Sequence, residues 1–374
     1  MSFIDVFADI SRDKLALALN SCSAKDVEQA LDSAPGNVTS LMALLSPAAA
    51  PYIEEMAVRS VALTRQRFGS NLSMFIPLYL SNLCANECDY CGFSMSNKLK
   101  RKTLNTSELA AEMAIVKARG FDSILLVSGE HETKVGMDYF RQVLPQVKQE
   151  FNHVAMEVQP LEQADYQELV QLGLDGVMSY QETYQRHTYA KHHTRGNKQD
   201  FAYRLATPDR IAAAGVDKIG LGVLLGLDDW RVDALLMGHH LAYLERTYWR
   251  SRFSISLPRL RPCTGGIPPK VALSDLGLVQ LICAFRLFNH QLDISLSTRE
   301  SAALRDQLMP LGVTQISAGS STQPGGYQFP NSQLDQFEIS DERSVDKVVE
   351  AIRRHGLSPV FKDWEGQWRS GAPY

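Results

Sequence analysis

Residues 83–93 read Leu83-Cys84-Ala85-Asn86-Glu87-Cys88-Asp89-Tyr90-Cys91-Gly92-Phe93, and they place three cysteines in a C-x-x-x-C-x-x-C array. Three thiolates can ligate three irons of a cubane iron–sulfur cluster and leave the fourth iron open. An open metal position can accept a substrate or a cofactor, as it does in catalytic zinc sites. We therefore expect a [4Fe–4S] cluster on Cys84, Cys88 and Cys91, with its chemistry at the fourth iron.

Two other uses of these cysteines fit the sequence less well. Zinc needs a fourth ligand, and the candidates His131, Cys263 and Cys283 do not stand at the short spacing that structural zinc sites favour. A disulfide framework does not suit six cysteines in 374 residues behind an amino terminus that lacks signal-peptide features. The pattern predicts reduced thiols in a cytoplasmic protein.

The composition is that of a globular enzyme with one large core. Hydrophobic residues make up 45% of the chain and the net charge is −4, which gives no electrostatic footprint for nucleic acid. No apolar run reaches the 18 or so residues of a membrane span. The local basic run at 98–102 predicts a solvated loop or a docking patch for an acidic electron donor.

Eight short β-branched or apolar runs alternate with amphipathic helical stretches. They lie at 75–80, 123–127, 153–158, 176–180, 218–223, 253–257, 293–297 and 313–317. Such alternation predicts parallel βαβ units, and eight is the count of a TIM-type (β/α)8 barrel. A partial barrel of six strands with a separate carboxy-terminal piece fits almost as well, but we expect the full barrel.

The helical signals and composition divide the chain into three predicted parts. Residues 1–70 lack strand signals and predict a helical region over the bottom or side of the barrel. The barrel is expected over 71–330. Residues 331–374 are polar at first, and they predict one helix near 345–354 followed by an aromatic tail from Trp364.

Polar residues follow the strands where each strand is predicted to end. In a parallel barrel those ends meet at one mouth, where barrel enzymes place their chemistry. Charged groups beside buried strands are costly unless they are paired or functional. The candidates are Ser128, Gly129, Glu130, Glu157, Glu182, Arg299 and Ser317. By contrast, His187, His192 and His193 are expected in a solvated loop, where a second metal site is disfavoured.

Longer motifs carry a resemblance to a known family. Besides the cysteine array, they are Pro77 to Asn82, Gly92-Phe93-Ser94, Tyr180 to Tyr184, Leu296 to Glu300, Ile316 to Ser320 and Pro324 to Tyr327. The chain resembles the aromatic amino-acid lyases among the radical S-adenosylmethionine (SAM) enzymes, and most of all the tyrosine lyases of thiamine thiazole biosynthesis. The resemblance implies cleavage of the L-tyrosine Cα–Cβ bond to 2-iminoacetate and p-cresol, with SAM converted to methionine and 5′-deoxyadenosine.

The resemblance also implies residues that bind SAM, which would chelate the open iron. Ser128, Gly129 and Glu130 match the motif whose backbone holds the SAM amino group. Glu157 and Glu182 would accept bonds from the ribose hydroxyls or the ammonium, although they could instead pair with Lys or Arg on the barrel rim. Lys198, or alternatively Arg195, would pair with the SAM carboxylate.

Three residues match positions that contact the substrate in the family. Tyr79 matches the position that faces the tyrosine amine, although it could simply pack against the first strand. Arg299 matches the anchor of the substrate carboxylate, and Ser317 is a second contact. A guanidinium suits that role because its fork fits a carboxylate bidentately.

Related families and a non-catalytic sensor are the alternatives. Hydrogenase-maturation tyrosine lyases carry a further C-x-x-C motif, whereas no cysteine follows Cys283 here. Biotin synthase holds a second cluster that Cys22, Cys263 and Cys283 do not match. The resemblance implies two protein partners, namely a flavodoxin- or ferredoxin-type electron donor and a thiazole synthase that accepts the unstable product.

Overall fold

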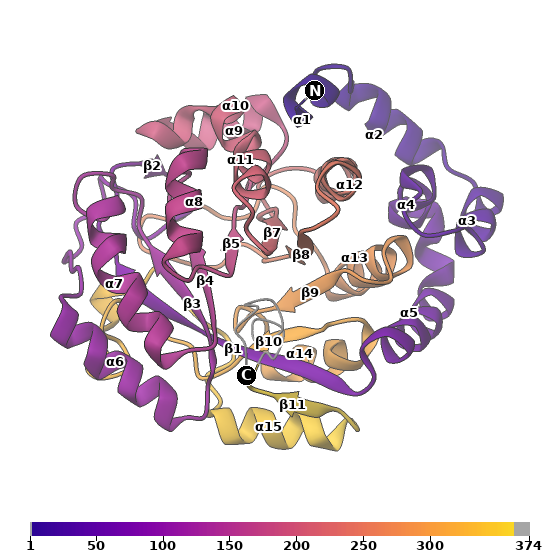
Figure 1. The fold of residues 1–374 in the computed structure, drawn as a ribbon. Coiled ribbons are helices and arrows are strands. Elements are labelled where there is room, and N and C mark those ends of the chain that lie inside the picture. Colours follow the sequence, from indigo (N-terminus) through magenta and orange to yellow (C-terminus); the bar gives the residue numbers. More distant parts are fainter. Residues whose placement is uncertain (1, 363–374) are drawn as a thin grey trace.

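The computed structural model describes residues 2–362, and its centre is a closed barrel of parallel strands inside a ring of helices (Figure 1). The strands are β1 (Asn71–Ser81), β3 (Ser123–Ser128), β4 (His153–Glu157), β5 (Gly176–Met178), β7 (Lys218–Gly222), β8 (Arg252–Ser256), β9 (Asp293–Leu296) and β10 (Gln315–Ser317). The barrel closes where β10 pairs with β1, with Ser73 opposite Gln315 and Phe75 opposite Ser317. The predicted (β/α)8 barrel is confirmed, and this closure excludes the six-strand alternative.

Within the described chain, nine α-helices lie between the strands and form the outer ring of the barrel. They are α6 (Thr106–Ala118), α7 (Met137–Glu150), α8 (Gln163–Gln171), α9 (Arg186–His192), α10 (Phe201–Leu205), α11 (Thr207–Ala213), α12 (Trp230–Thr247), α13 (Asp275–Phe288) and α14 (Ala302–Leu308). Asn105 caps α6 in a reciprocal capping box with Glu108. Gly120 follows that helix at φ +89°, a conformation that glycine adopts without steric cost.

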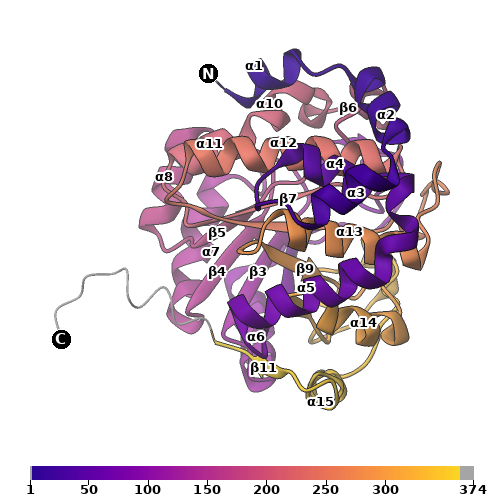
Figure 2. The same cartoon turned by 90° about the vertical axis from the view of Figure 1, so that its right-hand side faces the viewer.

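Residues 3–68 are mostly helical, as predicted, and they cover one side of the barrel. The elements are α1 (Phe3–Ala8), α2 (Arg12–Ser21), α3 (Ala24–Leu31), α4 (Val38–Leu45), the 3-10 helix η1 (Pro47–Tyr52) and α5 (Ile53–Phe68). They run outside α12 and α13, as Figures 1 and 2 show. Leu41 of α4 fits against Gly238 of α12, where an added Cβ would lie 2.2 Å from the leucine Cδ2. Gly238 therefore lets the two helices approach closely.

The end of the described chain returns to the start of the barrel. Helix α15 (Val345–Arg354) confirms the predicted carboxy-terminal helix. It leads into β11 (Ser358–Val360), which pairs in parallel with Asn71 to Ser73 of β1. Strand β11 was not predicted, because three residues around Pro359 carry no strand pattern. The predicted aromatic tail from Trp364 lies outside the described residues.

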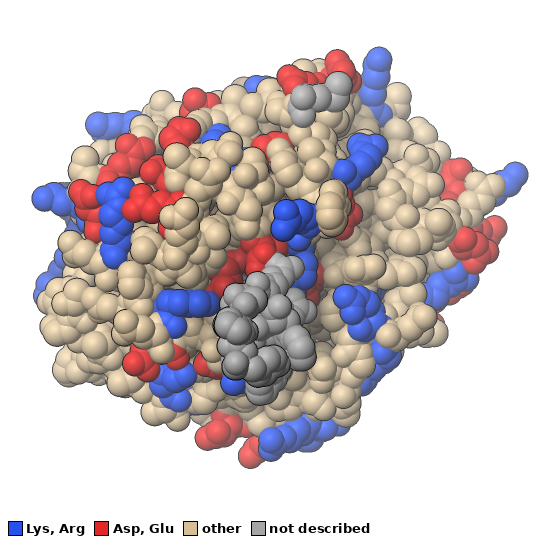
Figure 3. All heavy atoms as spheres, in the orientation of Figure 1, with Lys and Arg blue, Asp and Glu red and all other residues tan. Residues whose placement is uncertain are grey.

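The surface and the helices agree with the composition. On the face shown in Figure 3, Lys and Arg side chains are interspersed with Asp and Glu rather than gathered into one basic field. Within residues 2–362, no helix is long and apolar enough to cross a bilayer.

Candidate active site

A cavity of about 190 Å³ opens at the carboxyl ends of the barrel strands. All twelve candidate residues from the sequence line it. They are Tyr79, Cys84, Cys88, Cys91, Ser128, Gly129, Glu130, Glu157, Glu182, Lys198, Arg299 and Ser317. They come from seven different stretches of chain, so the barrel topology brings them together. Arg195, the alternative to Lys198, is exposed in β6 (His193–Arg195) and does not line this cavity.

The cysteine loop leaves the end of β1 and is held on three sides. Ala85 N–H donates to the Glu130 carbonyl at 2.8 Å. Cys88 lies in β2 (Glu87–Cys88), which pairs antiparallel with β6. Arg101 donates to the carbonyls of Asn82 at 2.7 Å and Phe93 at 2.8 Å. Arg101, from the basic run at 98–102, therefore folds inward onto the loop rather than standing in solvent as expected.

Gly129 fits under this loop because it lacks a side chain. A Cβ at that position would lie 2.4 Å from the Leu83 carbonyl oxygen. The backbone after β3 therefore lies directly against the loop that carries Cys84. The adjacent Ser128 Oγ is buried and has no hydrogen-bond partner in the described structure.

The three thiols lie in surroundings that suit metal ligands better than free thiolates. Burial raises the pKa of Cys84 to about 11, and it raises the pKa of Cys91 as well. A bound metal overcomes that penalty because coordination deprotonates a thiol outright. Among residues 2–362, no three His, Cys, Asp or Glu side chains form a site for a single metal ion. A cubane cluster needs no single-ion site, because each thiolate binds a different iron. Three thiols that line one cavity therefore fit an open cluster. The unpartnered Ser128 hydroxyl beside them leaves a polar group for a ligand of that cluster.

Four charged side chains and one amide form a buried network beside the cysteines. Lys198 Nζ lies 2.8 Å from Glu182 Oε1 and 4.0 Å from Glu130 Oε1. Arg204 Nη2 donates to Glu130 Oε1, and Asn86 Nδ2 donates to Glu130 Oε2 at 2.8 Å. Although burial opposes it, the charges of Arg204 and Lys198 lower the pKa of Glu130. Glu130 is therefore held as a carboxylate.

Glu182 enters this network from a strained backbone position. Among the described residues it is the one non-glycine residue with positive φ, at 67°. Such a conformation costs about 1–3 kcal/mol and persists where the surroundings fix it. Here the Glu182 carbonyl accepts from Leu224 N–H at 2.8 Å, and the side chain is tied to Lys198.

Glu157 and Arg299 face the cavity without strong partners. The Glu157 carboxylate makes no hydrogen bond or ion pair with another described residue, and burial, reinforced by the charge of Glu182, raises its pKa to about 7. Arg299 stacks on the Phe337 ring at 3.5 Å from the centroid and makes one long bond of 3.4 Å to the Arg259 carbonyl. The remaining donors of its guanidinium stay available to a ligand.

Tyr79 and Ser317 come from the two strands that close the barrel. Tyr79 Oη donates to Gln336 Oε1 at 2.7 Å, and its ring meets Phe93 edge-on at 5.9 Å. Ser317 is 2% exposed, and its carbonyl accepts from Arg305.

Sequence reasoning missed four residues that shape the cavity. Asn86 and Arg204 belong to the ion-pair network, and Gln336 and Phe337 form one wall. Asn86 lies inside the quoted loop, so its position was a usable signal. Arg204 lies in a short helix and the other two lie beyond the predicted end of the barrel, where no strand pattern points to them.

The expectation of a solvated histidine loop is wrong for two of the three residues. His192 and His193 are buried at the end of α9, whereas His187 is exposed. His192 Nδ1 lies 2.8 Å from Asp89 Oδ1, and His193 Nε2 lies 2.6 Å from Tyr90 Oη. They are buried because the cysteine loop packs over this turn.

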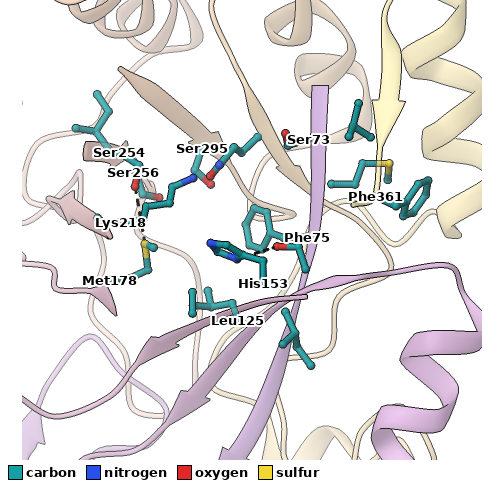
Figure 4. A pocket seen from close by; sticks show the side chains of 18 of the residues that line it. Ser73, Phe75, Leu125, His153, Met178, Lys218, Ser254, Ser256, Ser295 and Phe361 are labelled. Atoms are coloured by element: carbon teal, nitrogen blue, oxygen red, sulfur yellow. Dashed lines mark hydrogen bonds between the residues drawn. The ribbon is translucent and has the colours of Figure 1, made fainter. Parts of the chain in front are cut away.

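A second, smaller cavity of about 60 Å³ lies deeper in the barrel (Figure 4). Phe75, Leu125 and Met178 line both cavities, so they form a floor between them. Lys218, also drawn in Figure 4, is neutralised by Asp293 at 2.8 Å. The barrel interior is thus mostly filled, and the larger space is at the mouth.

Comparisons with known proteins identify the family. A model of the radical SAM superfamily matches residues 78–237, and one of the Biotin and Thiamin Synthesis associated domain matches residues 256–358. The 2-iminoacetate synthase of Escherichia coli strain K12 is 53% identical over 97% of both chains, and that of Salmonella typhimurium strain LT2 is 52% identical over the same shares. The crystal structure of HydG, a maturase of the [FeFe]-hydrogenase, is similar with a TM-score of 0.89 and 29% identity, over 96% of this chain and 81% of that one.

Proposed function

The chain belongs to the 2-iminoacetate synthase family of radical SAM enzymes, and we propose on that basis how its barrel mouth carries out the reaction. It is a carbon–carbon lyase that cleaves the Cα–Cβ bond of L-tyrosine to 2-iminoacetate (dehydroglycine) and p-cresol, while SAM is converted to methionine and 5′-deoxyadenosine. Its cofactors are a [4Fe–4S] cluster and SAM. When bound, the cluster and SAM together supply a 5′-deoxyadenosyl radical, and the protein provides binding, orientation and exclusion of water.

The cysteines and the ion-pair network form the proposed cofactor end of the cavity. Cys84, Cys88 and Cys91 ligate the cluster. Lys198 and Glu130 present a cation and an anion, which suit the carboxylate and the ammonium of a bound amino acid such as the methionine part of SAM. Arg204 pairs with Glu130 and keeps it ionised, so Arg204 supports the binding of the SAM ammonium indirectly.

Backbone and carboxylate groups complete the proposed SAM site. The chain at Ser128 and Gly129 lies against the cysteine loop, so its polar groups are close to any ligand on the open iron. Glu182 and Glu157 are available to ribose hydroxyls from the other side of the mouth. Glu157 is the better acceptor, because Glu182 is already bonded to Lys198.

Arg299, Tyr79 and Ser317 form the proposed substrate end. The Arg299 side chain is half-buried and stacked on Phe337, so its orientation is fixed while most of its donors remain free for the tyrosine carboxylate. Tyr79 presents a hydroxyl that can contact the substrate amine, and Ser317 adds a second polar contact. Holding both the carboxylate and the amine would orient the substrate amino nitrogen, from which the family abstracts hydrogen, toward the cofactor end.

One observation carries these assignments: the three cysteines and the nine other candidates line a single cavity. The test is anaerobic reconstitution with iron and sulfide, followed by addition of reductant, SAM and tyrosine, with 5′-deoxyadenosine and p-cresol measured together. Cys84→Ala, Cys88→Ala and Cys91→Ala should each lose most cluster iron and all SAM cleavage, whereas Cys283→Ala in α13 should retain both. Activity in all three array variants would refute the cluster assignment.

We further propose partners and a cellular role. The product is an unstable imine, so a thiazole synthase would receive it directly to build the thiazole of thiamine. A flavodoxin- or ferredoxin-type protein would donate the electron. Six free thiols favour the cytoplasm, and no role with nucleic acid or membranes is proposed. The division at residues 70 and 330 also stays a proposal.

A further inference from the structure

Gln336 crosses the mouth from a segment outside the predicted barrel. It follows the 3-10 helix η4 (Ser332–Leu334) and lines the same cavity as the cysteines. Its backbone is fixed on both sides, because its N–H donates to the Thr322 carbonyl at 3.0 Å and its carbonyl accepts from Gly92 N–H at 3.0 Å. A Cβ on Gly92 would lie 2.4 Å from the backbone carbonyl oxygen of Gln336, so the cysteine loop and this segment are in direct contact.

The side-chain amide of Gln336 joins two groups with different proposed roles. Its Oε1 accepts from Tyr79 Oη at 2.7 Å, and its Nε2 donates to Cys91 Sγ at 3.6 Å. A thiolate can only accept a hydrogen bond, so the amide must turn its N–H toward sulfur and its oxygen toward the tyrosine. One side chain therefore connects a proposed cluster ligand with the residue proposed to face the substrate amine.

We propose that Gln336 is a positioning residue that tunes the reduction of the cluster through Cys91 and fixes the hydroxyl of Tyr79. Hydrogen bonds to cluster sulfurs help to set the reduction potential of iron–sulfur centres. Adding one electron makes the cluster more negative, so a donor on the sulfur stabilises the reduced form and raises the potential. The inference rests on the proposed function, since it requires a cluster on Cys91.

The test measures the cluster without SAM or tyrosine. Reconstituted protein is titrated with a low-potential one-electron reductant, and the reduced cluster is followed by electron paramagnetic resonance. Gln336→Leu and Gln336→Glu should both lower the ratio of reduced to oxidised cluster about tenfold at the wild-type midpoint, which is a shift of about 59 mV for one electron. Gln333→Leu, an exposed position in the same segment, should leave the midpoint unchanged.

A second readout separates positioning from a general loss of structure. Gln336→Glu keeps an oxygen that can accept from Tyr79, so its ratio of 5′-deoxyadenosine to p-cresol should stay near the wild-type ratio, whereas Gln336→Leu should raise it. If the leucine variant fails to hold iron, the glutamate variant decides the question. An unchanged midpoint potential in a variant with full iron content overturns the inference about Gln336 and leaves the proposed function standing. Wild-type protein that binds no cluster would overturn the proposed function as well.

Discussion

Replacing Arg204 with methionine should destabilise the protein strongly, because it leaves the Glu130 carboxylate without its main partner. The side chains of the pair are only 6% and 16% exposed. Breaking a buried ion pair by removing one partner costs about 3–5 kcal/mol. Lys198 stands 4.0 Å from Glu130, where two charges at an effective dielectric constant of 20 attract by about 4 kcal/mol. Because Lys198 still attracts Glu130, we expect the free energy of unfolding to fall by about 3 kcal/mol, the lower end of that range.

The loss should depend on pH in a direction that the network determines. In the wild type, the lowered pKa of Glu130 means that its contribution is present at neutral pH and is lost as pH falls through the folded-state value. In Arg204→Met, one of the two positive charges that oppose the effect of burial is gone, so the pKa of Glu130 rises. The destabilisation should therefore be larger at pH 8 than at pH 6, where Glu130 more readily accepts a proton.

Urea unfolding of the metal-free protein, followed by far-ultraviolet circular dichroism at both pH values, measures this difference. The matched control is Arg141→Met, since Arg141 pairs with Glu168 in a site that is 45% and 37% exposed. An exposed pair contributes about 0–1 kcal/mol. The double variant Arg204→Met/Glu130→Gln should recover part of the stability. A loss no larger than that of Arg141→Met, or one identical at both pH values, would refute the reasoning.

Three further predictions concern ligands. Arg299→Lys keeps the charge but loses the fork, and losing one charged hydrogen bond of about 1.5–3 kcal/mol should raise the KM for tyrosine by about 10- to 150-fold. Slow SAM cleavage without tyrosine should persist, and loss of SAM binding would move Arg299 into the cofactor site. Tyr79→Phe removes the hydroxyl bonded to Gln336 and should raise the ratio of 5′-deoxyadenosine to p-cresol; an unchanged ratio would mean that Tyr79 only packs. Because the pKa of Glu157 is about 7, the wild-type affinity for SAM measured by equilibrium dialysis should fall from pH 8 to pH 6 as the carboxylate takes a proton. Glu157→Gln should flatten that dependence, and equal slopes in both proteins would contradict the role.

The barrel was predictable because its strands repeat one physical pattern. Each buried parallel strand is a short apolar run bounded by helix signals, and capping residues such as Asn105 mark where the helices begin. The polar groups at the strand ends were predictable for the same reason, since topology alone brings Glu130, Glu157 and Arg299 to one mouth.

Other features depend on tertiary contacts that no local pattern reports. Strand β11 forms because β1 offers an unpaired edge near Asn71, and not because residues 358–360 favour a strand. Gln336 acquires its position from backbone contacts with Gly92, which is far away in the sequence, and with Thr322, which precedes it in the same loop region. Arg204 sits on a short helix, so its partner Glu130, 74 positions earlier, is visible only in three dimensions.

The contact between Gly92 and Gln336 also has a consequence for the order of synthesis. Ribosomes add about 5–20 residues per second, so roughly 10–50 seconds separate the emergence of the cysteine loop from that of the segment that covers it. During that interval β10 and Gln336 are absent, and the thiols stand open to oxidants as well as to iron. Ribosome-bound chains stopped before residue 315 should therefore react with maleimide at Cys91 much faster than the finished chain does. Equal reactivity would show that the loop is protected before the barrel closes.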